Sequence, residues 1–365
     1  ANKHIDKQVA SLDIGFLEEK DNWLLHPKFF PSKVGGKPAW LDLMNIPNPS
    51  ELTCKKCRDP LVFLCQIYAP YEESNDGFHR TIFVFVCRNG SCCHSNVSDN
   101  FLVLRCQLPR KNHFYSYEPC EETENQEFPM DKWPRLCELC GSKGPSHCSK
   151  CKKTYYCSRK HQVLDWQKGH KTICPTLQRL RSTLYTYKPN NFNVTEAGKS
   201  ILFKEWELIV DEEDEEDSKN VDENQEMEKL KKMMQEKRAG TLSNVTEDEL
   251  EHYAKPVPED KVFNKFNKRV NRHPDQVLRY DRGGQPLWIT GNTDDSIANV
   301  PSCIYCNSER QFEFQIMPQL LNFIDVGIEL NSIDWGVLIV YTCKASCSQG
   351  PAYKEEFLIK QDFLK

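Results

Sequence analysis

Residues 137–174 read CELCGSKGPSHCSKCKKTYYCSRKHQVLDWQKGHKTIC, and eight cysteines and histidines of this stretch fall into four regularly spaced pairs. Eight such ligands match two tetrahedral zinc ions, each of which takes four Cys or His side chains. A segment of roughly 40 residues buries too little apolar surface to fold by itself, so metal binding would supply its folding free energy. The four pairs are Cys137 and Cys140, Cys148 and Cys151, Cys157 and His161, and His170 and Cys174.

A disulfide framework is the main alternative for a cysteine-rich stretch. The two paired histidines favour zinc instead. The sequence shows no secretory leader, so we expect a reducing compartment in which its 18 cysteines stay available for metal. No apolar run approaches the roughly 18 residues that a membrane span requires, so we expect no membrane partner.

Length and composition allow two or three domains, because 365 residues with 39% hydrophobic content can bury a sizeable core. The net charge is only −5, which indicates no overall attraction to nucleic acid or membrane. The charge is uneven, however: Lys and Arg dominate residues 132–181, whereas every residue from Asp211 to Asp217 is acidic. We interpret the basic stretch as the solvated surface of a small metal module and expect no direct nucleic-acid binding.

A second cysteine set lies upstream of the first stretch. Two apolar runs, residues 61–68 and 80–86, predict strands and lie between two cysteine pairs. This order is typical of a zinc ribbon, in which the metal ties strand ends together. Two alternatives stay open: Cys93 could replace Cys92, and the cysteines could be free and buried in a sheet. The predicted ligands are Cys54, Cys57, Cys87 and Cys92.

The chain repeats this pattern near its end. The motif GGQPLW at 283–288 echoes GGKPAW at 35–40, and two later strand-like runs echo residues 63–67 and 83–87. Two similar units most simply pair into one pseudo-symmetric β-rich domain. The later runs are 312–316 and 339–343, and the predicted ligands of the second unit are Cys303, Cys306, Cys343 and Cys347.

We therefore expect an α+β, mainly β fold: a pseudo-symmetric domain of two β-rich halves with the double-zinc module inserted between them. Alternation predicts a strand that ends at Val210, and apolar spacing predicts helices near 227–234, 247–254 and 263–270. Ser158 should cap a helix over 159–168 that Gly169 ends. The expected parts are a first half at 14–130, the zinc module at 131–176, a connecting segment and strand at 177–210, an acidic flexible linker with short helices at 211–256, and a second half at 257–365.

Catalytic motifs are missing from the sequence. We find no nucleophile elbow, phosphate loop, HExxH or glycine-rich dinucleotide turn. Zinc held by four protein ligands leaves no open position for a reactive water, so we expect structural zinc. The protein is therefore predicted not to be an enzyme, with no catalytic residues.

The eight-ligand stretch resembles the MYND zinc finger, including Tyr156-Cys157-Ser158 and the tail from His161 to Cys174. MYND modules bind short proline-containing peptides. The resemblance therefore implies a peptide groove in this chain, which Gln162 and Trp166 would line. The alternative for Trp166 is that it only covers the zinc knuckles. Many members carry Cys where this chain has His161, and imidazole also binds zinc. The implied zinc sets are Cys137, Cys140, Cys157 and His161 on one ion, and Cys148, Cys151, His170 and Cys174 on the other.

The rest of the chain resembles the programmed cell death protein 2 family over about residues 15–362. The motifs that carry this resemblance are PSKVGG at 31–36, LPRKN at 108–112, FYSYE at 114–118, QIMPQLL at 315–321 and SIDWG at 332–336. The resemblance implies a non-enzymatic adaptor or chaperone that captures a newly made small-subunit ribosomal protein and supports 40S ribosomal subunit biogenesis, in cytoplasm and nucleus. Related members lack the MYND module, which implies that the paired β halves hold the client.

The MYND resemblance also suggests two other functions. A transcriptional co-regulator adaptor would use the MYND groove to bind proline-containing peptides and would act in cell proliferation or apoptosis. A lysine methyltransferase is disfavoured, because the Asn-His-Ser-Cys cofactor stretch of SET domains is missing and the paired cysteine halves have no counterpart there. From the four ligand sets we expect two zinc ions in the finger and one more in each outer half.

Overall fold

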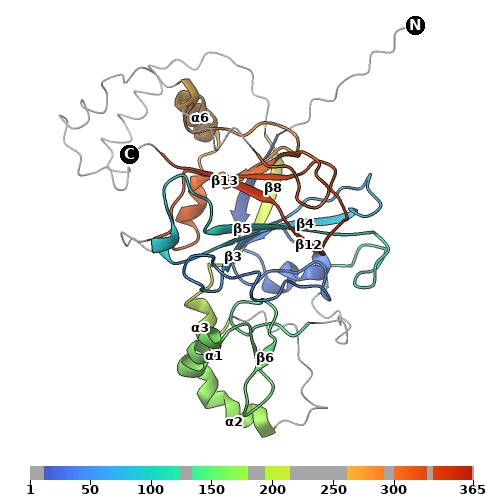
Figure 1. Cartoon of the computed structure of the whole chain (residues 1–365), viewed down its shortest axis with the longest axis vertical. Coiled ribbons are helices and arrows are strands. Elements are labelled where there is room, and N and C mark those ends of the chain that lie inside the picture. Colours follow the sequence, from blue (N-terminus) through green and yellow to red (C-terminus); the bar gives the residue numbers. More distant parts are fainter. Residues whose placement is uncertain are drawn as a thin grey trace, which may run out of the picture.

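The computed structural model describes residues 12–123, 134–179, 194–213, 261–291, 300–326 and 332–363. The helices predicted near 227–234 and 247–254, and most of the predicted acidic linker, lie outside these residues. The expected mainly β fold is confirmed: one large antiparallel sheet of 11 strands forms the body of the molecule, and the zinc finger projects from one end of it (Figure 1). No helix in the described ranges has the length and apolar character needed to cross a membrane.

The large sheet contains two similar sets of strands. Its order is β12-β5-β4-β3-β2-β8-β1-β9-β10-β11-β13. The first set is β1 (Asp13–Glu18), β2 (Lys33–Val34), β3 (Val62–Tyr68), β4 (His79–Val86) and β5 (Phe101–Leu108). The second set is β8 (Trp206–Glu212), β9 (Leu278–Tyr280), β10 (Arg310–Ile316), β11 (Val337–Cys343), β12 (Tyr353–Glu355) and β13 (Phe357–Gln361).

The first strand of each set lies in the other half of the sheet. β8 pairs with β2 of the first set, and β1 pairs with β9 of the second. β1 and β8 pair with each other, from Asp13 opposite Glu212 to Glu18 opposite Glu207. The pseudo-two-fold relation between the halves therefore passes between β1 and β8, and neither half forms its sheet without a strand from the other.

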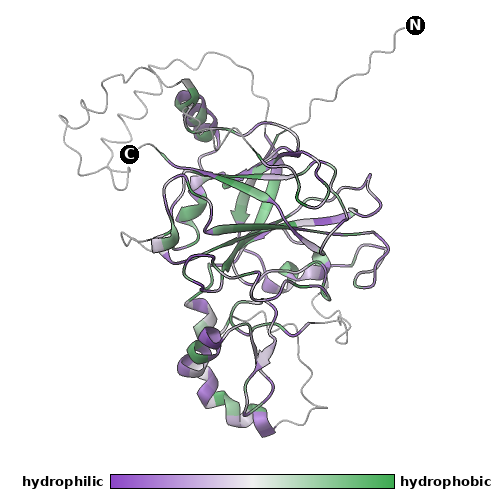
Figure 2. Ribbon diagram, in the orientation of Figure 1, coloured by the Kyte–Doolittle hydropathy of each residue, from purple (hydrophilic) through white to green (hydrophobic). Residues whose placement is uncertain are grey.

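The sheet nearly closes on itself through its last two strands. β12 pairs with β5, whereas β13 pairs with β11, and only Glu356 separates β12 from β13 in the chain. One continuous segment therefore joins the two ends of the sheet, and Figure 1 shows β13 and β12 following each other past β5. The inner strands are predominantly hydrophobic, and their buried side chains form the core (Figure 2).

The internal repeat is visible in equivalent side-chain contacts. The side-chain oxygen of Gln66 accepts the backbone N–H of Ala39 at 2.8 Å, and that of Gln315 accepts the N–H of Leu287 at 2.6 Å. Ala39 and Leu287 each precede the tryptophan of the repeated GGxPxW motif. β3 and β10 also carry a bulge at the same place, two residues before the glutamine. The two halves are thus structural copies as well as sequence copies.

The finger consists of β6 (Ser146–His147), β7 (Tyr155–Tyr156) and a run of helix, and it packs against the first half. The Trp40 indole N–H donates to the Gly141 carbonyl at 2.7 Å, and Lys160 pairs with Asp59 at 2.7 Å. Gly141 has a φ of 71°, and a Cβ there would lie 2.7 Å from Cβ of Lys37, so glycine suits this junction. The helical segments are α1 (Arg159–Asp165), η5 (Trp166–His170), α2 (Lys171–Arg179) and the short α3 (Glu196–Lys199).

Three sequence-based element predictions can be compared with the structure. Ser158 caps α1 as predicted, but Gly169 does not end the helix; the chain kinks there and stays helical to Arg179. The predicted strand forms as β8 but reaches Glu212, so the linker cannot begin at 211. Pairing with β1 carries the strand into the acidic run, which composition alone does not indicate.

The helix predicted near 263–270 is α6 (Lys261–Arg272). The remaining one-turn helices are η1 (Asn22–Leu25), η2 (Pro27–Phe29), η3 (Gly90–Cys92) and η7 (Pro318–Asn322).

Candidate zinc centres

Four Cys-x2-Cys turns share one backbone geometry. In each turn, the carbonyl of the first cysteine accepts the N–H of the residue that follows the second cysteine, at 2.8–3.1 Å. That residue has a left-handed backbone, with φ between 57° and 71°. The turn brings both thiols to the same side, as a metal knuckle requires. The left-handed residues are Arg58, Gly141, Lys152 and Asn307.

The first centre of the finger joins the start of the stretch to α1. The Ser158 hydroxyl accepts the backbone N–H of His161 at 3.2 Å and so fixes the first helical turn. This places the His161 Nδ1 atom 3.2 Å from the Cys157 sulfur and 3.6 Å from the Cys137 sulfur. Cys140 completes the group, 3.6 Å from Cys157.

The second centre of the finger lies beside the helical kink. The His170 Nε2 atom is 3.6 Å from the Cys151 sulfur, and the sulfurs of Cys148 and Cys174 are 3.8 Å apart. The other ring nitrogen of His170 lies 3.5 Å from the Thr154 hydroxyl, which is placed to orient the ring toward zinc. The buried carboxylate of Asp165 lies 3.9 Å from the same nitrogen, beyond hydrogen-bond distance. That carboxylate accepts the Tyr156 hydroxyl at 2.7 Å and places a negative charge beside the centre.

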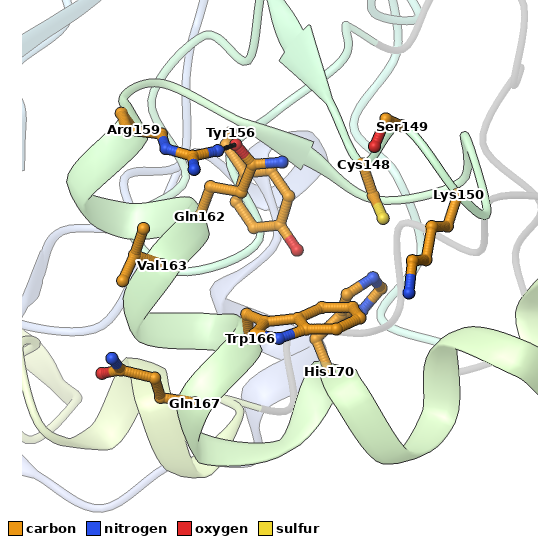
Figure 3. Close-up of a pocket in the computed structure, with 10 residues that line it drawn as sticks. All are labelled: Cys148, Ser149, Lys150, Tyr156, Arg159, Gln162, Val163, Trp166, Gln167 and His170. Carbon is orange, nitrogen blue, oxygen red and sulfur yellow. Dashed lines mark hydrogen bonds between the residues drawn. The ribbon is translucent and has the colours of Figure 1, made fainter.

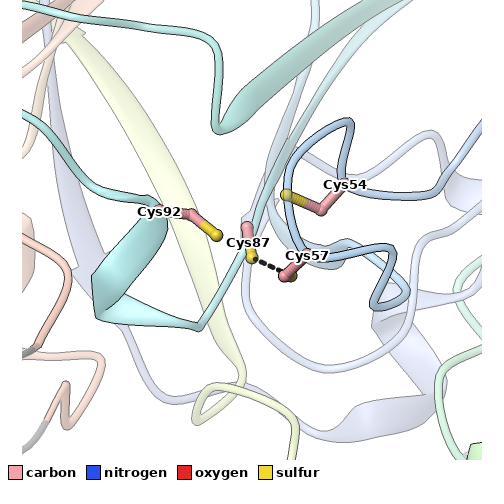
Figure 4. A group of neighbouring side chains, drawn as sticks. All are labelled: Cys54, Cys57, Cys87 and Cys92. Atoms are coloured by element: carbon pink, nitrogen blue, oxygen red, sulfur yellow. Dashed lines mark hydrogen bonds between the residues drawn. The ribbon is translucent and has the colours of Figure 1, made fainter.

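The two outer cysteine sets form equivalent groups at the strand ends of each half. In the first, the Cys57 and Cys87 sulfurs lie 3.5 Å apart, and η3 turns Cys92 toward them (Figure 4). Cys93, the alternative to Cys92, is not part of the group, because its thiol lies 3.4 Å from the Asp334 carbonyl. In the second, the sulfur of Cys303 is 3.8 Å from Cys347 and that of Cys306 is 3.5 Å from Cys343.

These distances fit zinc and do not fit disulfides. A zinc ion with Zn–S bonds of about 2.3 Å at tetrahedral angles separates its sulfurs by about 3.8 Å, whereas a disulfide bond is about 2.05 Å long. Within each group all ligand atoms lie within 4.8 Å of one another, and all 18 cysteines are free. Every predicted ligand falls into one of four groups of four, with the interleaved order that the MYND resemblance implies. The clusters are compatible with zinc binding.

Hydrogen bonds favour the thiolate at the first cysteine of three knuckles. Burial alone would raise the pKa of Cys148, but the N–H groups of Cys151 and Lys150 and the His170 ring lower it to about 6. The pKa values of Cys54 and Cys303 are also lowered, because backbone N–H groups and neighbouring thiols outweigh burial. Zinc binds the thiolate, so these three ligands are prepared for metal.

A cleft of about 250 Å³ lies on the finger beside the second centre (Figure 3). Both residues predicted for the peptide groove, Gln162 and Trp166, line it. Trp166 also contacts the His170 ring, at 5.9 Å between centroids, so it covers the zinc centre as well as lining the cleft. Sequence reasoning missed Lys150, whose ammonium lies 5.0 Å from the centre of the Trp166 ring. Its position inside the Cys148–Cys151 knuckle was the available signal.

Three family models match the chain. Residues 11–122 match the N-terminal domain of programmed cell death protein 2, residues 260–362 match its C-terminal domain, and residues 137–174 match the MYND finger. No solved structure matches.

Full-length relatives give the same assignment. Programmed cell death protein 2 of Bos taurus is 41% identical over 98% of both chains. Programmed cell death protein 2-like of Homo sapiens is 28% identical over 91% of this chain and 90% of its own. The relative named "Probable 20S rRNA accumulation protein 4" in Schizosaccharomyces pombe is 25% identical over 88% of this chain and 89% of its own.

Proposed function

This chain belongs to the programmed cell death protein 2 family, and we propose that it is a non-enzymatic adaptor that captures a newly made small-subunit ribosomal protein and supports 40S subunit biogenesis. The observation that carries the proposal is the similarity to the S. pombe relative named for 20S rRNA accumulation. That similarity is not confined to one motif, since it covers 88% of this chain and 89% of the relative.

The zinc centres support a structural rather than a hydrolytic role. Each group offers four protein ligands, so a zinc ion bound there has no open coordination position. We propose four zinc ions per chain, two in the finger and one in each outer half. The outer ions would hold the ends of β4 and β11, because Cys87 follows β4 and Cys343 ends β11.

A second function, peptide binding at the finger cleft, has its own observation. Trp166 and Gln162 line the cleft, and the Arg159 guanidinium donates to the Gln162 side-chain oxygen at 3.1 Å, which holds that amide in place. An aromatic ring beside a fixed amide suits a proline-containing peptide. Titration with such a peptide should change Trp fluorescence in the parent protein and give no binding to a Trp166→Ala variant.

The two functions can be separated by affinity capture of the tagged full-length protein from cells. We compare the parent with a Gln162→Ala, Trp166→Ala variant, which alters the cleft and leaves every zinc ligand in place. A Lys171→Ala variant is the control, because Lys171 is exposed on the finger and does not line the cleft. Co-purifying proteins are identified and quantified.

Stoichiometric recovery of one small-subunit ribosomal protein by all three forms would support client capture by the β halves. If no ribosomal protein were recovered, and proline-motif proteins were recovered by the parent and the control but lost in the cleft variant, the capture proposal would be wrong and the peptide adaptor would stand.

A further inference from the structure

The helix α6 has two unlike faces. Its apolar face packs on the second half: Phe266 is only 2% exposed and belongs to a buried cluster with Ile289, Phe312 and Met317. The opposite face is open to solvent along the length of the helix. α6 lies at one end of the molecule and the zinc finger at the other (Figure 1).

The open face of α6 carries positively charged side chains. The helix contains no Asp or Glu, and Lys265, Lys268 and Arg272 are all exposed. Within the described part of the chain, none of these three forms an ion pair, whereas Arg269, on the side of the helix, pairs with Glu213 at 2.7 Å. Glu213 is already shared, since Arg279 binds the same carboxylate oxygen at 2.9 Å. The nearby acid is therefore used by other arginines.

The spacing of the exposed residues makes them one binding surface. Lys265, Lys268 and Arg272 follow each other at three and four positions, which places them on the same side of a helix. At 1.5 Å per residue they extend over roughly 10 Å. Two exposed amides, Asn264 and Asn271, flank the cations and can donate to further acceptors.

We propose that this face of α6 binds the phosphate backbone of an RNA strand. Cations in a row, flanked by amide donors, match repeated phosphates. A membrane surface is a poorer match, because insertion needs an apolar face and the apolar face of α6 is used by the core. The choice of RNA rests on the proposed role in 40S subunit biogenesis. The proposal departs from the sequence-based expectation of no direct nucleic-acid binding, which rested on the net charge of −5 and on the basic stretch at 132–181.

The test measures binding of a short fluorescently labelled single-stranded RNA by the full-length protein, at a series of KCl concentrations. A Lys265→Glu, Lys268→Glu, Arg272→Glu variant should bind roughly tenfold more weakly or worse. Its plot of log affinity against log salt should be shallower by about 2, because each single-strand phosphate contact contributes about 0.7 to that slope. The milder Lys265→Gln, Lys268→Gln, Arg272→Gln variant should shift both quantities in the same direction.

The matched control reverses three exposed cations of the finger, in a Lys152→Glu, Lys168→Glu, Lys171→Glu variant with the same change in net charge. It should bind RNA nearly as the parent does. Equal loss in both variants, or no binding by the parent, would overturn the proposal. RNA binding that emerges only after the acids at 214–217 are neutralised would identify those acids as a competing occupant of this face and would overturn the proposal for the natural chain.

Capture of the ribosomal protein is measured on the same variants. It should persist in the α6 variants, so a failure of RNA binding and a failure of the proposed function give different results.

Discussion

The Arg80 guanidinium donates to both carboxylate oxygens of Glu313, at 2.6 and 2.8 Å, and neither side chain is exposed to solvent. Arg80 lies on β4 of the first half and Glu313 on β10 of the second. The Tyr280 hydroxyl also donates to Glu313, at 2.8 Å. A second buried pair, Arg105 with Glu356 at 2.6 Å, lies where the sheet closes. Charge pairing inside the nearly closed sheet therefore joins the two copies of the repeat.

Replacing Glu313 with Gln should destabilise the fold by about 3 kcal/mol, because the buried Arg80 charge would keep no counter-charge. Urea unfolding of the zinc-loaded protein measures the loss. Glu196→Gln is the control, since it breaks the exposed pair with Lys199 and should leave the unfolding midpoint unchanged. Equal midpoints for both variants would show that the buried pair does not stabilise the fold.

This stabilisation should depend on pH in a defined window. Burial alone would raise the pKa of Glu313, but the Arg80 charge and hydrogen bonds lower it from 4.5 to about 2. Because the folded pKa lies below the unfolded one, the carboxylate stabilises the fold fully above about pH 4.5 and loses that effect as the pH falls toward 2. The difference in unfolding free energy between the parent and Glu313→Gln should shrink across this window. A difference that does not change with pH would contradict the assignment.

The neighbouring thiols Cys92 and Cys93 provide a direct test of the first outer centre. After dialysis against a competing chelator, Cys92→Ser should lose one of the four proposed zinc ions, whereas Cys93→Ser should retain all four. Metal content per chain is measured by mass spectrometry. Retention of four ions by both variants would show that Cys92 is not a required zinc ligand at this centre.

Asp165→Asn should weaken zinc binding at the second finger centre by roughly tenfold, because it removes a buried negative charge 3.9 Å from the His170 ring while every ligand remains. Competition with a chromogenic chelator measures the affinity. Asp59→Asn, which breaks a surface pair with Lys160, is the matched control and should leave zinc affinity unchanged. A similar affinity in both variants would show that the Asp165 charge does not help to hold the ion.

The exchange of β1 and β8 predicts that neither half folds alone. A chain cut between residues 180 and 193 yields one fragment with β1 to β5 and the finger, and another with β8 to β13. β2 would then lack its neighbour β8, and β9 would lack β1. Expressed separately, the fragments should aggregate; expressed together, they should co-purify. Soluble, β-rich fragments obtained separately would contradict the exchange.

The strands that sequence analysis found are those whose pattern is local. β3, β4 and β11 contain apolar runs, β10 was located because it echoes β3, and all four were predicted within two residues of their observed bounds. β5 and β13 were missed, because buried Arg105 and Lys360 interrupt their patterns. Arg105 is satisfied by Glu356, and Lys360 by Asp362 and the His94 carbonyl. A charged side chain is unfavourable in a buried strand unless a partner satisfies it, and two of these partners, Glu356 and His94, lie far away in the sequence.

The sequence by itself located the cysteine and histidine pairs and the two-fold repeat, because metal knuckles and repeated motifs are matters of short-range spacing. The interleaved division of the finger pairs between two ions was implied by the MYND resemblance and not by the spacing. It did not determine how the copies combine. Only the tertiary structure decided that β1 and β8 exchange halves, that β12 and β13 close the sheet, and that Arg80 meets Glu313. Those pairings join residues far apart in the chain, and their free energy comes from burial and charge neutralisation that exist only once both halves are in place.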